Sequence, residues 1–137
     1  MNKRLLTSAI LASGLLLALS PRTAIAHHSF AAEFDGDKPI TLKGIVTRID
    51  WMNPHVWFYL NVKQEDGSTV RWGCEMGAPH QLQQRGWLRE TMKIGDVVTV
   101  MGSLSRDGAK RANARLVTTA DGKTLGAASS GDPTTRQ

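Results

Sequence analysis

Apolar and polar residues alternate most regularly over residues 55–62 and 70–76. In both segments the even-numbered positions are apolar, and an alternation of period two predicts strands with one buried and one exposed face. Between them, Glu65-Asp66-Gly67 suits a three-residue hairpin loop with Gly67 in the left-handed conformation. The register is well specified, because a slip of one residue would mix the two faces. The expected inward pairs are Val62 with Val70, Leu60 with Trp72, Phe58 with Cys74, and Val56 with Met76.

The same register defines an outer face that is aromatic and mildly charged. Trp57 is expected opposite Glu75, and Tyr59 opposite Gly73, where its ring can cover the bare backbone. The full set of outward side chains is His55, Trp57, Tyr59 and Asn61 on the first strand, and Arg71, Gly73 and Glu75 on the second.

The rest of the pattern predicts three more strands and one helix. Residues 40–51 predict a long strand whose inward parity switches beside Gly44, which indicates a bulge or a sharp bend there. Pro79 suits the first position of a short helix that ends at Arg85, before Gly86. The remaining strands are expected over residues 97–102 and 112–119.

This order of elements predicts an all-β fold with one short helix, a small five-stranded OB-like barrel over residues 39–120. Residues 27–38 are expected to form an N-terminal arm that Phe30 and Phe34 pin to the body. Residues 121–137 are rich in Gly, Ala, Ser, Thr and Pro, a composition that is typical of a disordered tail.

Residues 1–26 have the features of a secretory signal peptide. A positive start, Asn2-Lys3-Arg4, precedes an apolar run that ends at Ser20, and Ala24-Ile25-Ala26 supplies the small-x-small cleavage pattern. The apolar run is shorter than the roughly 20 residues of a spanning helix. We therefore expect cleavage after Ala26, export to the periplasm or the medium, and no stable membrane anchor afterwards.

Charge and cysteine content narrow the classes of partner. The chain has 17 basic and 12 acidic residues, and three of the basic ones, Lys3, Arg4 and Arg22, lie in the predicted signal peptide. The mature domain is therefore only mildly basic, which argues against nucleic acid as a partner. Its single cysteine, Cys74, cannot form an internal disulfide and is expected to be a buried, reduced thiol, with a copper or intermolecular role as the alternative.

Histidines provide the first candidate site. Cleavage after Ala26 makes His27 the new N-terminus, whose amine and imidazole together can bind one transition-metal ion, and copper suits such a nitrogen set. His55 is the expected third ligand, with His28, His80 and Glu75 as additional candidates, and zinc is the alternative metal. The opposing interpretation is a solvated histidine pair and a His55 that only organises a turn.

The outer face provides the second candidate site. The chain has neither a Gly-x-Ser-x-Gly elbow nor a phosphate loop, so we predict a non-enzymatic binding module. OB barrels often bind ligands on strands two and three. An aromatic face of this kind can bind a sugar, a peptide or another planar group, and this binding needs no metal. The expected partner is therefore a small ligand or a periplasmic protein. The candidate ligand-binding residues are Trp57, Tyr59, Arg71 and Glu75.

Five short motifs carry a resemblance to a known family. They are His27-His28-Ser29-Phe30, Trp51-x-Asn53-Pro54-His55, Gly86-Trp87, Gly95-Asp96-x-Val98 and Arg111-Ala112-Asn113-Ala114. Together they span nearly all of the mature chain and resemble small exported bacterial proteins of the domain-of-unknown-function family 6152. The resemblance implies export and a small β-rich domain, and it implies no reaction.

Overall fold

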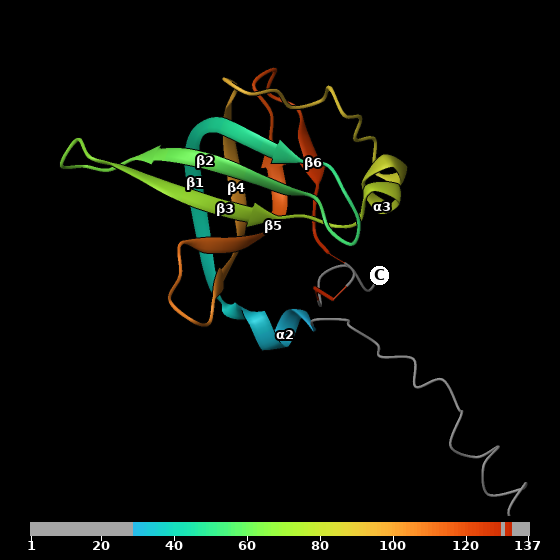
Figure 1. Ribbon diagram of the computed structural model, residues 1–137, viewed down its shortest axis with the longest axis horizontal. Coiled ribbons are helices and arrows are strands. Elements are labelled where there is room, and N and C mark those ends of the chain that lie inside the picture. The colour runs from blue at the N-terminus through green and yellow to red at the C-terminus, as the bar shows by residue number, and fades with distance from the viewer. Residues whose placement is uncertain (1–28, 130, 133–137) are drawn as a thin grey trace, which may run out of the picture.

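Six strands form one ring-like sheet in the computed structural model, which describes residues 29–129, 131 and 132 (Figure 1). The strand order is β3-β2-β1-β4-β5-β6, and β3 also pairs with β5. That pairing is parallel, whereas the others are antiparallel. The strands are β1 (Phe34–Asp50), β2 (Trp57–Lys63), β3 (Thr69–Glu75), β4 (Val97–Ser105), β5 (Arg111–Thr118) and β6 (Thr124–Gly126), and the helices are α2 (Phe30–Glu33) and α3 (Pro79–Gln84). The predicted all-β class with a short helix between the third and fourth strands is confirmed.

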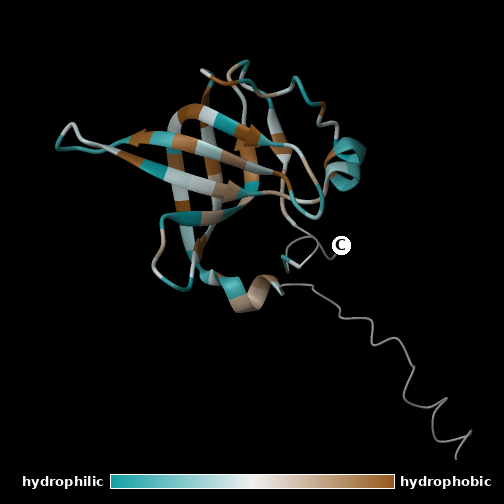
Figure 2. Cartoon of the chain, in the orientation of Figure 1, coloured by the Kyte–Doolittle hydropathy of each residue, from teal (hydrophilic) through white to brown (hydrophobic). Residues whose placement is uncertain are grey.

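The β2–β3 hairpin has the predicted register. Phe58 pairs with Cys74, and the pairs on either side follow the expected inward alignment. Val56 and Met76 continue it, because the Met76 amide donates to the Val56 carbonyl over 2.8 Å. Gly67 has a φ of 82°, the left-handed conformation expected for the loop. The inward residues of β2 are buried, and Figure 2 shows apolar residues concentrated on the strands while the hairpin tip and α3 are hydrophilic.

The bend of β1 corrects one detail of the prediction. β1 pairs with β4 along its first part and with β2 along its last part, so it curls around the sheet (Figure 1). The register shift lies between Val46 and Arg48, not beside Gly44, and Ile45 is 49% exposed. Gly44 is needed for a different reason. A Cβ there would lie 2.7 Å from the Asn61 carbonyl oxygen, so only glycine permits this close approach of two strands.

The C-terminal segment differs from the predicted disordered tail. Residues 124–126 form β6 on the free edge of β5, and the Ala127 carbonyl accepts a 2.8 Å hydrogen bond from the Gly77 amide. Ala127, Ala128 and Ser129 are buried. Small residues give little local signal, yet they allow the close backbone packing seen here. Residues 130 and 133–137 lie outside the described part of the chain.

Both ends of the domain meet near α2. Phe30 and Phe34 are buried with ring centroids 5.8 Å apart. The expected N-terminal arm is shorter than predicted, because β1 already begins at Phe34, where its backbone pairs with Ser105 of β4. A Cβ at Gly131 would lie 2.9 Å from the Phe30 Cβ, so the C-terminal segment passes directly against this helix. The predicted signal peptide, residues 1–26, lies outside the described residues. Neither helix of the described part is long and apolar enough to cross a membrane.

Candidate functional site

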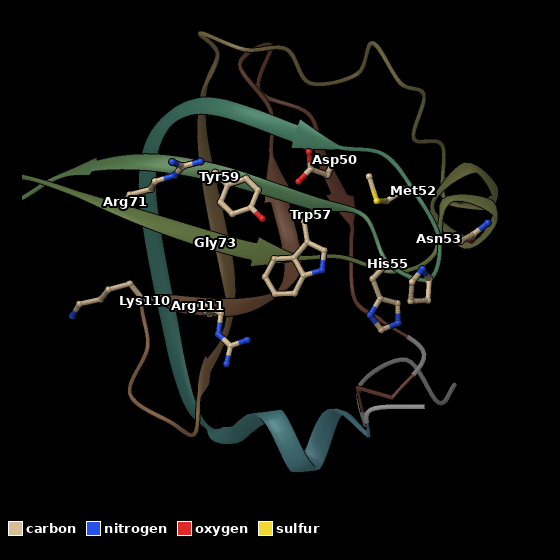
Figure 3. A pocket seen from close by; sticks show the side chains of 11 residues that line it. Asp50, Met52, Asn53, His55, Trp57, Tyr59, Arg71, Gly73, Lys110 and Arg111 are labelled. Atoms are coloured by element: carbon tan, nitrogen blue, oxygen red, sulfur yellow. The ribbon is translucent and has the colours of Figure 1, made fainter. Parts of the chain in front are cut away.

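A groove of about 600 Å³ lies over the outer face of β2 and β3 (Figure 3). Three of the four residues proposed for ligand binding, Trp57, Tyr59 and Arg71, line it, and so does His55. The segment between β1 and β2 supplies one wall through residues 52–55, and the segment entering β5 supplies Lys110 and Arg111. The two sites that the sequence suggested therefore overlap at His55.

Two aromatic side chains lie against a glycine that also lines the groove. A Cβ placed on Gly73 would lie 3.4 Å from the Tyr59 ring and 3.5 Å from the Trp57 ring. The predicted contact between Tyr59 and Gly73 is therefore confirmed, and Trp57 shares it. Both aromatic residues are only partly buried, whereas Gly73 is buried. The result is an aromatic surface in the groove, with part of each aromatic residue still exposed.

Two arginine side chains lie against the Tyr59 ring of this aromatic surface, whereas Lys110, which also lines the groove, lies near the inward-facing Trp72. The Arg71 guanidinium carbon lies 4.9 Å from the centroid of the Tyr59 ring, and that of Arg48 lies 5.4 Å from the same centroid. Arg48 also pairs with Asp50, the acidic residue that lines the groove, through a 2.8 Å Nε–Oδ1 contact. Lys110 places its Nζ 5.4 Å from the centroid of the Trp72 ring.

Arg111 is already paired. Its Nη2 lies 2.5 Å from Oδ2 of Asp107. A hydrogen bond from the Ser105 hydroxyl, together with the Ala109 amide and Arg111 itself, lowers the pKa of Asp107 to about 2. Asp107 therefore stays ionised at any ordinary pH and offsets the charge of Arg111.

His55 is held by a buried carboxylate. Its Nδ1 lies 3.0 Å from Oε1 of Glu75, and the same oxygen accepts a 3.1 Å hydrogen bond from Nδ2 of Asn113. In this contact the Nδ1–H of His55 donates to the carboxylate, which leaves Nε2 for another partner. The hydrogen bond to Glu75 is the main cause that raises the pKa of His55 above 6.5, while burial of the ring opposes the rise and the charges of Glu75 and Glu33 support it.

Glu75 does not line the groove as expected. Its side chain is only 8% exposed. The physical reason is the parallel pairing of β3 with β5, which aligns Glu75 with Asn113 and covers that end of β3. Asn113 is in turn fixed by a 3.0 Å hydrogen bond to the Ser129 hydroxyl. Glu75 therefore orients the His55 ring through this buried contact and does not face a ligand in the groove.

The remaining metal candidates are only partly described. His27 and His28 lie outside the described residues, and His80 is exposed on α3 and does not line the groove. Within residues 29–129, 131 and 132, no three histidine, cysteine or acidic side chains are grouped so that they could hold a metal ion. Cys74 is buried and unpaired as predicted, and burial raises the pKa of its thiol to about 12.

Sequence reasoning missed one wall of the groove. Lys110 and Arg111 come from a turn far along the chain, and only the pairing of β5 with β3 brings them beside Gly73. Two of the short sequence motifs, the one that begins at Arg111 and the one that ends at His55, contribute to this groove. Their positions along the chain do not indicate that both reach the same groove.

The chain belongs to the family described as "Family of unknown function (DUF6152)", which it matches over residues 15–114. Every residue that lines the groove falls inside the matched segment. No curated protein and no solved structure is significantly similar to the chain.

Proposed function

We propose that this member of the family is an exported, non-enzymatic binding module whose groove holds a small planar ligand without a metal. The observation that carries the proposal is the groove of about 600 Å³ on the outer face of β2 and β3, with Trp57 and Tyr59 against Gly73. Ligand sites typically enclose about 300–1,000 Å³ and combine aromatic walls with a few polar groups. A ligand of one or two rings fits that volume.

The aromatic side chains are suited to a flat partner. A ring that packs on Trp57 or Tyr59 removes apolar surface from water and gains the additional attraction of aromatic pairs, about 0.5–1.5 kcal/mol for each pair. Gly73 aids this by letting both rings lie close to the backbone, which limits their motion before binding. Export fits the same role, because the mature domain would begin at His27 and act in the periplasm or the medium.

Nuclear magnetic resonance with a library of one-ring and two-ring planar compounds tests the proposal. We expect binding compounds to shift the amide signals of Trp57, Tyr59 and Gly73. Trp57→Ala should abolish binding, whereas Leu88→Ala, at a residue that is 56% exposed and outside the groove, should leave it unchanged. A chelator should have no effect. The proposal is refuted if no compound shifts these amides, or if the chelator abolishes binding.

A second candidate function, copper binding, is favoured by the orientation of His55. A histidine that binds a metal through one ring nitrogen usually donates the N–H of the other to a carboxylate, a backbone carbonyl or a water, and His55 meets the carboxylate of Glu75 in this way. In this hypothesis Nε2 of His55 would join the amine and imidazole of His27 at the mature N-terminus, with His28 nearby in the sequence. Copper is favoured over zinc because of the nitrogen ligands.

Copper titration of two forms of the mature protein tests this second function. A form with an additional N-terminal methionine keeps all histidines but moves the amine away from the His27 imidazole, so it should bind Cu(II) much more weakly. His55→Ala should also weaken binding, and the control His80→Ala should not. Equal binding by the extended and native-ended forms would refute the site.

A further inference from the structure

We propose that the planar ligand of the groove is a small organic anion, an aromatic carboxylate, whose carboxylate contacts Arg71. This inference rests on the proposed function of the groove and names its ligand class. It starts from the charged side chains that line the groove, which are Asp50, Arg71, Lys110 and Arg111, besides His55.

Two of these charges are already compensated. Asp50 pairs with Arg48, and Arg111 pairs with Asp107, and neither partner lines the groove. The carboxylate of Glu75 lies buried behind His55. The groove therefore offers no uncompensated negative charge to attract a cationic ligand.

Arg71 and Lys110 are the uncompensated cations. In the described part of the chain, no carboxylate lies within ion-pair distance of either one, and both are exposed. Their charged groups lie near aromatic rings instead, Arg71 beside Tyr59 and Lys110 beside Trp72. An aromatic ring does not occupy the N–H donors of a guanidinium as a carboxylate does. A carboxylate can therefore still bind Arg71 through two of its N–H groups.

The position of Arg71 fixes the shape of the expected anion. Arg71 and Gly73 are two residues apart on β3 and therefore point to the same side, about 7 Å from each other along the strand. The Arg71 guanidinium carbon lies 4.9 Å from the centroid of the Tyr59 ring, so a carboxylate bound to Arg71 lies beside the aromatic surface, and Figure 3 shows Arg71 beside Tyr59 with Trp57 further along. The Gly73 amide also donates to the Lys110 carbonyl over 3.0 Å, which holds Lys110 at the edge of the same surface.

Two matched probes separate charge from shape. 2-Naphthoate and 2-naphthamide share one ring system, but only the first is anionic. We expect 2-naphthoate to bind at least tenfold more tightly, as judged by tryptophan fluorescence or by the amide shifts of Gly73. Arg71→Gln should remove about tenfold of that affinity and leave 2-naphthamide unchanged, since charge-assisted hydrogen bonds contribute that much. Lys63→Gln changes the same charge on β2 outside the groove and serves as control.

The outcomes distinguish this inference from the proposed function. Equal affinity for both probes would overturn the anionic class and leave a planar-ligand groove intact. The anionic class is also wrong if Arg71→Gln, verified as folded by its unchanged melting temperature, binds 2-naphthoate as well as the wild type does. Binding of neither probe would count against both proposals. Tighter binding of single-stranded oligothymidine than of 2-naphthoate would show that the ligand is a polymeric anion, and the small-anion class would then be wrong.

Discussion

Gly102 packs against the backbone of Asn113, the residue that holds Glu75 behind His55. Gly102 lies in β4 opposite Ala114 of β5, next to the irregularity of that pairing. A Cβ added there would lie 2.0 Å from the carbonyl oxygen of Asn113 and 3.2 Å from the Cα of Ala114. Ordinary contacts begin at about 3.4 Å, so the backbone of Asn113 must move by more than 1 Å in Gly102→Ala.

The substitution Gly102→Ala is expected to have two effects, a loss of stability and a changed titration of His55. Overpacking of this kind destabilises a fold by about 1–3 kcal/mol, and backbone atoms yield less readily than the end of a side chain. The displacement also disturbs the Asn113 side chain, whose Nδ2 donates to Glu75 over 3.1 Å. We expect Gly102→Ala to lower the free energy of unfolding by about 3 kcal/mol. It should also change the titration of His55, because the hydrogen bond to Glu75 is the main cause that raises the pKa of His55.

Urea unfolding measures the loss of stability, and a histidine titration by nuclear magnetic resonance measures the change at His55. Gly126→Ala is the matched control, since its new Cβ would meet only the Cδ of Arg85 at 3.7 Å. It should change the stability by less than about 1 kcal/mol and leave the His55 titration unaltered. The reasoning is refuted if Gly102→Ala is as stable as the control and titrates like the wild type.

Three further predictions follow from burial and charge. The hydrogen bond to Glu75 raises the pKa of His55. The stability that this interaction adds to the folded protein is therefore fully present below about pH 6.5, and it is lost as the pH rises through the higher pKa of the folded state. Urea unfolding across that range should show this loss in the wild type and not in Glu75→Gln; parallel curves would disprove it. Phe58→Ala should cost about 3–5 kcal/mol by cavity formation, since Phe58 is fully buried, and a calorimetric loss below 1 kcal/mol would contradict the packing. Cys74 should react with a disulfide reagent at pH 8 only in urea, because burial raises its pKa to about 12; rapid reaction of the folded protein would show that it is accessible.

The alternation of apolar residues determined the hairpin and one face of the site. Period two fixes which side chains share a face, and the loop at Gly67 fixes how the two strands align. The outward positions of Trp57, Tyr59 and Arg71 follow from these two local facts. The helix that starts at Pro79 was equally predictable, because its end signals also lie within one short segment.

The metal hypothesis shows where such local reasoning stops. The ring orientation of His55 depends on Glu75, which lies 20 positions further along the chain and is covered by β5. The sequence placed Glu75 on the outer face correctly by parity. It gave no sign that a neighbouring strand would bury it, since burial depends on which strands become neighbours.

Only the tertiary structure decided how the ring of strands is completed. The parallel alignment of β3 with β5 brings Arg111 beside Gly73 and Asn113 beside Glu75. The attachment of β6 and the burial of Ala127 likewise depend on surfaces supplied by distant segments. The physical reason is the range of the interactions. Side-chain periodicity is a property of neighbouring residues, whereas strand pairing across the ring depends on packing and hydrogen bonds between segments that only the folded chain brings together.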